Sequence, residues 1–142
     1  IDLFPTLITF AYYLKKNKIP INLVTIKNPI IKKGFVNLIA ANNSNILIKN
    51  IKKCDLIFNS RSLCEMDKET VSNYFNFINS CEVKYFYHEN SNFLLFPNSK
   101  RHIEIMGDDF PINSKKFKLL TKYITPFTGG DGRYREYIYE RR

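Results

Sequence analysis

The stretch CDLIFNSRSLCEM, residues 54–66, decides the fold because it joins a strand signal to a helix signal through a polar turn. Residues 56–59 are predicted to form a buried strand. Asp67 follows the stretch as a helix cap, and residues 69–80 repeat apolar side chains at helical spacing. Strand, polar turn and helix in this order predict an α/β layer architecture.

The flanking sequence extends the same architecture. Residues 4–16 are predicted to form a helix, with Pro5 in the first turn and Lys15 and Lys16 at the end. Alternating or continuous apolar runs predict the strands. These strands are residues 21–26 and 35–41 before the quoted stretch, and 83–87, 117–124 and 134–140 after it. The last two are expected to form an antiparallel pair that closes the sheet.

The composition suits one globular domain: 142 residues are 44% hydrophobic and carry a net charge of +9. The lysines occur singly or in pairs along the chain and form no basic block, which makes nucleic acid an unexpected partner. The three cysteines match neither a disulfide framework nor a zinc motif, so we expect reduced thiols and a cytoplasmic location. No apolar run approaches the ~20 residues of a membrane span.

Four segments carry a family resemblance: IDLFPTL (1–7), DLIFNSRSLCEM (55–66), YFYHENSN (85–92) and PFTGGDGRYREYIYERR (126–142). They resemble the sugar O-methyltransferase family of bacteria, which are class I S-adenosylmethionine-dependent enzymes associated with surface polysaccharide gene clusters. The resemblance implies a Rossmann-like sheet, mostly parallel, with a C-terminal antiparallel strand pair. It also implies S-adenosylmethionine as cofactor and a sugar, nucleotide sugar or glycan as the methyl acceptor.

The chain departs from that family pattern at the start of the sheet. None of its five glycines lies in a glycine-rich turn after a first strand, where the backbone would approach the methionine part of the cofactor. We therefore expect residues 1–142 to be a single partial methyltransferase-like domain, covering the C-terminal two-thirds of the catalytic domain. We also expect weak cofactor binding by this chain alone.

The resemblance assigns cofactor contacts to residues at the ends of strands, where open α/β sheets bind their ligands. A carboxylate after the second strand is expected to accept the ribose hydroxyls, amides after the next strand to pair with adenine, and small polar groups to line the sulfonium. In that order the residues are Asp2; Asn42, Asn43 and Ser44; and Asn59 and Ser60. As alternatives, Asp2 is a helix cap and residues 42–44 form a plain turn.

Methyl transfer to a hydroxyl also requires a positioned acceptor and a base. We expect the base to be His88, Glu65 or Glu89, and His88 is attractive because an unperturbed pKa near ~6.5 suits a base at neutral pH. The alternative for His88 is a surface histidine hydrogen-bonded within a loop. The residues expected to receive the sugar are Arg61, Ser62, Asn90, Asn92 and Arg101.

Three other hypotheses remain open from the residues. A divalent metal held by His102, Glu104 and the pair Asp108 and Asp109 is disfavoured because the spacing matches no defined site, and we expect no metal. A basic nucleic-acid-binding module would gather its cations on one face. A catalytically inactive, methyltransferase-like interaction domain would keep the sheet but lose the pocket.

Overall fold

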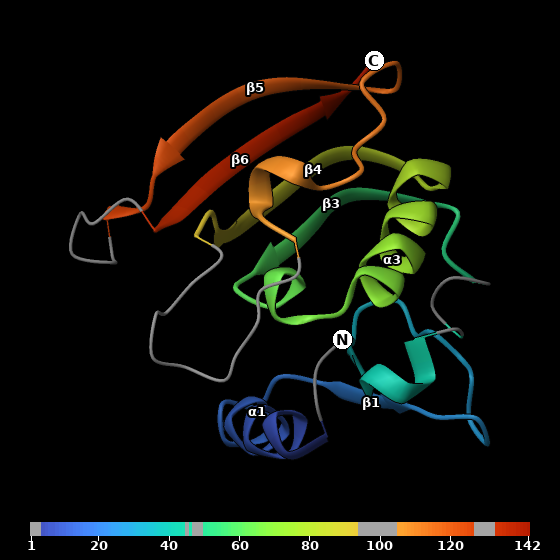
Figure 1. The fold of residues 1–142 in the computed structure, drawn as a ribbon. Helices are drawn as coiled ribbons and strands as arrows, with labels where there is room; N and C mark the ends of the chain where they lie inside the picture. The colour runs from blue at the N-terminus through green and yellow to red at the C-terminus, as the bar shows by residue number, and fades with distance from the viewer. Residues whose placement is uncertain (1–3, 45, 47–49, 94–104, 127–132) are drawn as a thin grey trace. The chain divides into compact units, whose positions relative to one another are not determined.

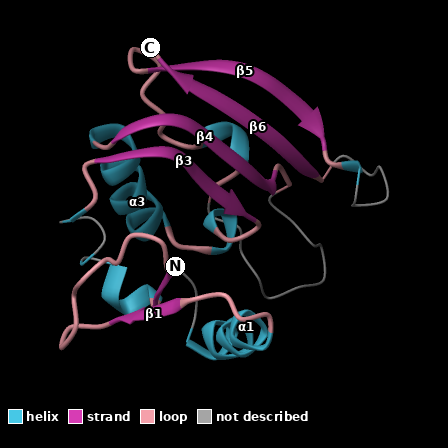
Figure 2. Cartoon of the chain, turned by 180° about the vertical axis from the view of Figure 1, so that it is seen from behind, coloured by secondary structure: helices cyan, strands magenta, loops and turns pink. Residues whose placement is uncertain are grey.

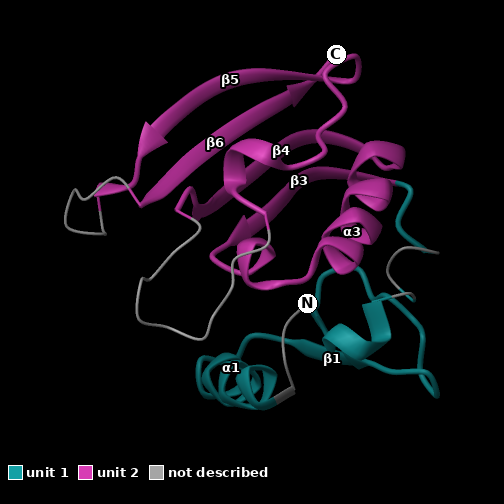
Figure 3. Ribbon diagram, viewed as in Figure 1, with its two compact units in different colours: residues 1–52 teal, residues 53–142 magenta. Residues whose placement is uncertain are grey.

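The computed structural model describes residues 4–44, 46, 50–93, 105–126 and 133–142. These residues form two compact units, Ile1–Lys52 and Lys53–Arg142 (Figure 3). That residues 1–142 form a single domain stays a prediction. No helix in these ranges is both long and apolar enough to cross a bilayer.

The first unit is a helix followed by two parallel strands. Helix α1 spans Phe4–Lys16, as predicted, and strands β1 (Ile21–Val24) and β2 (Val36–Ile39) pair in parallel. The buried side chains of Leu7, Leu14 and Leu38 form its core. The helix is amphipathic because residues seven apart return to the same face, and that face meets the strands.

The second unit is a mixed four-stranded sheet with one long helix (Figure 1). The elements, in chain order, are β3 (Lys53–Ser60), α3 (Lys68–Ser80), β4 (Glu82–Ser91), β5 (Phe117–Ile124) and β6 (Tyr134–Arg141). The strand order is β3-β4-β6-β5, in which β3 and β4 are parallel while β6 runs antiparallel to both of its neighbours. Strand β5 therefore runs parallel to β3 and β4.

Helix α3 covers one face of this sheet in both views (Figures 1 and 2). It begins after Asp67, whose side chain accepts a hydrogen bond from the Thr70 amide at 2.7 Å. The ring of Phe75 is buried and packs edge-on against Phe86 of β4, with centroids 5.8 Å apart. It also contacts Phe110, at 5.3 Å. These aromatic contacts join helix, sheet and the loop before β5 into one core.

The structure confirms the predicted antiparallel pair and corrects three details of the predicted strands. The chain is α/β, and its described strands form a parallel pair, β1 and β2, and a four-stranded mixed sheet. Strand β3 begins three residues earlier than predicted, and its Leu56 and Phe58 are exposed rather than buried. Strand β4 continues through residues 88–91, which we expected to be an irregular loop. Polar residues extend this strand because each of them pairs with β6, a contact that local sequence does not reveal.

The Phe75 contacts predict the effect of removing its ring. We expect Phe75→Ala to lower the free energy of unfolding by about 3–5 kcal/mol, because the variant leaves a cavity between α3 and the sheet. The exposed neighbour Asn76→Ala is the matched control, with a change within about 0.5 kcal/mol. Urea unfolding followed by far-ultraviolet circular dichroism measures both. Equal losses in the two variants would contradict the packing described here.

Candidate functional site

The carboxyl ends of β3 and β4 bring together most of the predicted site residues of the second unit. The two strands pair in parallel with Asn59 opposite His88 and Ser60 opposite Glu89. Parallel strands end at the same sheet edge, so their last side chains become neighbours. Successive side chains of β4 point to opposite faces of the sheet, so these residues are divided between the two faces. His88 and Asn90 share the face that carries Phe86 and α3, whereas Glu89 lies on the opposite face.

Glu89 and Arg61 form the central ion pair of that opposite face. Two guanidinium nitrogens of Arg61, Nε and Nη2, donate to the same carboxylate oxygen of Glu89 at 2.9 and 2.8 Å. Ser60 Oγ donates to the other oxygen at 2.8 Å. The guanidinium also lies over the ring of Tyr134, 4.9 Å from its centroid. Serine, glutamate and arginine are therefore held as one hydrogen-bonded group.

Arg61 adopts an unusual backbone conformation to make this pair. Its φ is +56°, in the left-handed region that non-glycine residues seldom occupy. The Arg61 amide donates to the carbonyl of Glu89 at 2.7 Å, which continues the strand pairing by one residue and holds the turn. Strained residues held in this way cluster at functional sites.

The electrostatics of Glu89 follow from the same contacts. Burial favours the neutral acid, but the hydrogen bonds from Arg61 and Ser60 outweigh burial and hold the pKa of Glu89 below its ordinary value of 4.5. Glu89 is therefore a carboxylate at neutral pH. Its two oxygens already accept hydrogen bonds, so it is a weak base.

On the α3 face, a second polar chain links Asn59, Ser62 and Asn90. Asn59 Nδ2 donates to Ser62 Oγ at 2.5 Å, and Asn90 Nδ2 donates to Asn59 Oδ1 at 2.9 Å. The Cys64 amide completes the chain by donating to Asn90 Oδ1 at 3.1 Å. The structure thus brings these three predicted residues together, but on the other side of the sheet from Ser60 and Glu89.

His88 is placed differently from the expectation. Its ring is fully buried and lies between aromatic rings, stacked on Tyr137 with centroids 4.3 Å apart and tilted against Phe110 at 5.1 Å. Neither ring nitrogen has a hydrogen-bond partner in the part of the chain that the structure describes. Burial lowers the pKa of His88 from 6.5 to about 3, and the nearby Asp108 carboxylate opposes this only in part. The expectation that His88 has an unperturbed pKa suited to a base at neutral pH is therefore wrong.

The remaining predicted residues lie elsewhere. Glu65 is exposed in the short 3-10 helix η2 (Leu63–Glu65). Asn42 and Asn43, in η1 (Ala41–Asn43), line a pocket of about 310 Å³ in the first unit, and Ser44 follows them. Asp2 and Arg101 lie outside the described residues.

That pocket lies at the carboxyl ends of the parallel strands β1 and β2. Its walls are mostly apolar, with the two asparagines as the amide groups among the lining residues. The full lining is Leu23, Val24, Thr25, Ala40, Ala41, Asn42 and Asn43. The position agrees with the strand-end location expected for a ligand of an α/β sheet.

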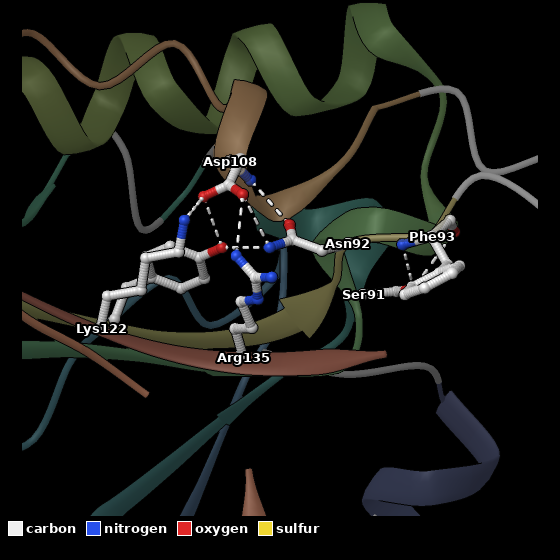
Figure 4. Close-up of polar contacts among 7 residues, drawn as sticks. Ser91, Asn92, Phe93, Asp108, Lys122 and Arg135 are labelled. Carbon is white, nitrogen blue, oxygen red and sulfur yellow. Dashed lines mark hydrogen bonds and ion pairs between the residues drawn. The ribbon is translucent and has the colours of Figure 1, made fainter. Parts of the chain in front are cut away.

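The structure contains a further polar cluster, of which only Asn92 was predicted as a site residue from the sequence. The Asp108 carboxylate accepts hydrogen bonds from Asn92 Nδ2 at 2.9 Å, Tyr137 Oη at 2.8 Å and Lys122 Nζ at 2.5 Å (Figure 4). Arg135 lies 3.4 Å from the same carboxylate. These residues come from β5, from β6, from the position after β4 and from the 3-10 helix η3 (Gly107–Asp109), and no local motif joins them. The only signal was the acidic pair at residues 108 and 109, which we had considered for a metal.

The same cluster bears on the metal hypothesis. Cations and hydrogen-bond donors occupy the Asp108 oxygens, an arrangement that competes with metal coordination. His102 and Glu104 lie outside the described residues. Within the residues that are described, no three histidine, cysteine or acidic side chains lie close enough together to hold an ion.

The comparisons with known proteins add no assignment. No protein-family model, no curated protein and no solved structure matches the chain.

The Glu89 contacts predict a pH-dependent loss of stability. The folded pKa of Glu89 is below its unfolded value, so its contribution is fully present above about pH 4.5 and is lost as pH falls through the folded pKa. We expect Glu89→Gln to lower the free energy of unfolding by about 1–2 kcal/mol at pH 7, with the difference from wild type shrinking below pH 4.5. Urea unfolding across this pH range measures the effect.

The control is the exposed Glu65→Gln, for which we expect little change at any pH. If Glu89→Gln and Glu65→Gln showed the same pH profile, the ion pair would contribute nothing to stability.

The burial of His88 predicts that its ring does not titrate near neutral pH. We expect its side-chain NMR shifts to stay constant from pH 8 to about pH 4.5, because the folded pKa is about 3. The same measurement in concentrated urea is the control, where the ring should titrate near ~6.5. A folded-state midpoint near neutral pH would show that the ring reaches solvent.

Proposed function

We propose that this chain contributes to an S-adenosylmethionine-dependent O-methyltransferase that methylates a hydroxyl of a sugar, in the cytoplasm, during surface polysaccharide synthesis. The observation that carries the proposal is the convergence of polar side chains at the carboxyl ends of β3 and β4. There Ser60, Arg61 and Glu89 lie on one face, while Asn59 and Asn90 lie on the other. Open α/β sheets bind their ligands at this edge.

The order of elements supports the finer fold assignment. The family resemblance implies a Rossmann-like class I sheet whose C-terminal strands form an antiparallel pair. The described strands end in such a pair, and parallel strands precede it in both units.

The cofactor contacts follow from the pocket and the strand ends. Asn42 and Asn43 present amide groups beside apolar walls, which suits the edge and faces of an adenine ring. Asn59 and Ser60, at the end of β3, would contact the methyl-bearing sulfonium end. S-adenosylmethionine supplies an activated methyl group, so the protein has to position the acceptor and accept its proton.

Among the three base candidates, the structure favours Glu65. His88 is enclosed by rings, and the Glu89 carboxylate already accepts hydrogen bonds from Arg61 and Ser60. The side chain of Glu65 is exposed, two positions before Asp67 caps the helix. We propose that Glu65 accepts the proton and that Glu89 orients Arg61 toward the sugar.

Calorimetric titration of S-adenosylmethionine and S-adenosylhomocysteine tests this function. The titration uses the 142-residue chain and the full product of its reading frame. We expect saturable binding by the full product. In that protein, replacing both Asn42 and Asn43 with alanine should weaken binding at least about tenfold, because two hydrogen-bonding amides are lost. The control Asn76→Ala, on the exposed side of α3, should bind like wild type.

The absence of binding by either protein would remove the cofactor from the proposal.

One observation favours a catalytically inactive interaction domain as the second candidate. Leu56 and Phe58 of β3 are 53% and 64% exposed, and Phe58 stacks on Tyr87 of β4 with centroids 4.8 Å apart. Sheets with parallel strands are ordinarily covered on both faces, so an apolar surface of this kind is typical of contact sites.

A further inference from the structure

We propose that Lys122 and Arg135, beside Asn92, form a binding site for an anionic group on the acceptor sugar, a phosphate or a carboxylate (Figure 4). Asp108 is the internal anion that holds these donors together when the site is empty. The inference deepens the proposed function, on which the identity of the ligand as a methyl acceptor rests. Anion binding itself is independent of that function.

The sheet register explains why these side chains meet. Arg135 and Tyr137 are alternate residues of β6 and therefore project from the same face. Lys122 of β5 lies directly opposite Tyr137, and Arg135 lies opposite Asn90, the last but one residue of β4. Asn92 follows the end of β4. The donors thus come from β5, from β6 and from the residue after β4, and they converge on one carboxylate.

Gly107 lets the Asp108 loop approach this face closely. A Cβ at position 107 would lie 3.2 Å from Asn92 Oδ1 and 3.4 Å from the Tyr137 ring. The close approach allows the Asp108 amide to donate to Asn92 Oδ1 at 2.9 Å. The side-chain amide of Asn92 is oriented by this bond and by its contacts with Asp108 Oδ2 and Tyr137 Oη.

The cluster carries more positive than negative charge. Lys122 and Arg135 contribute two cations, and Asp108 contributes one carboxylate. Lys122 holds that carboxylate closely, whereas Arg135 Nη1 is 3.4 Å from it, beyond a good charge-assisted bond. These three side chains together carry one net positive charge, which a single bound monoanion would balance.

Arg135 has donors to spare for such an anion. Its Nε atom is buried and has no hydrogen-bond partner among the described residues. A buried donor without an acceptor is costly, and a rotation of the partly exposed side chain would bring its planar guanidinium fork to two oxygens of one phosphate or carboxylate. The side chains of Lys122 and Arg135 are each 35% exposed, so an anion from solvent reaches them.

The test is an NMR titration of the ¹⁵N-labelled chain with sodium phosphate, with chloride adjusted to keep the ionic strength constant. The side-chain amide of Asn92 and Nε of Arg135 report directly on the site. We expect saturable shifts of both signals. Arg135→Gln should weaken binding at least about fivefold, and Asp108→Asn should tighten it about tenfold because the cluster then carries one more positive charge.

Two further variants keep the test specific. Lys118→Gln removes an exposed lysine from the same strand, β5, and should bind phosphate like wild type. Arg135→Lys keeps the charge without the planar fork and should give intermediate affinity. Shifts that do not saturate, or an equal loss in Lys118→Gln and Arg135→Gln, would overturn the site.

Separate arms with glucose 6-phosphate and glucuronate distinguish a phosphate ligand from a carboxylate. Tighter binding of glucose 6-phosphate would identify the anionic group as a phosphate, and tighter binding of glucuronate would identify it as a carboxylate. If the protein binds S-adenosylmethionine but not phosphate or either sugar, the anion site fails alone. If it binds phosphate but not the cofactor, the anion site stands and its role in methyl transfer fails.

Discussion

The parallel register between β3 and β4 is the constraint on which the second unit depends. Pairing Ser60 with Glu89 puts hydroxyl and carboxylate within hydrogen-bond distance, and it places Asn59 beside the strand that carries His88 and Asn90. A slip of one residue would move every side chain of one strand to the other face of the sheet. The ion pair of Arg61 with Glu89 and the left-handed turn at Arg61 hold this register at the strand end.

Strand β4 supplies two different environments because its side chains alternate. His88 and Asn90 face the aromatic core under α3, where burial keeps the imidazole neutral. Glu89 faces the other side, where hydrogen bonds from Arg61 and Ser60 keep its carboxylate charged. One strand thus carries a neutral titratable group and a charged one as direct neighbours. Burial without a hydrogen-bond partner disfavours the charged form of His88, whereas hydrogen-bond donors stabilise the charged form of Glu89.

On the core side of the sheet, hydrogen-bond donors also keep the Asp108 carboxylate charged. Burial favours the neutral acid, but Lys122 and Tyr137 outweigh it and hold the pKa of Asp108 below its ordinary value. Tyr137 joins this carboxylate to the buried aromatic rings, because its hydroxyl donates to Asp108 and its ring stacks on His88.

The sequence alone determined the elements, because local periodicity and capping are local properties. The helix at residues 4–16, the Asp67 cap, the helix after it and the closing antiparallel pair were all predicted close to their observed bounds. It also identified the strand-end residues Asn59 to Ser62 as a polar cluster. These signals depend on side-chain spacing of 3.6 or 2 residues and on the chemistry of one turn.

Only the tertiary structure decided which strands are neighbours and where each polar side chain points. Strand β6, last in the chain, lies between β4 and β5, and its pairing turns residues 88–91 from an expected loop into strand. That pairing buries His88 and gathers Lys122, Arg135 and Asn92 around Asp108. Contacts between residues far apart in the chain set these distances, and no pattern along the sequence encodes them.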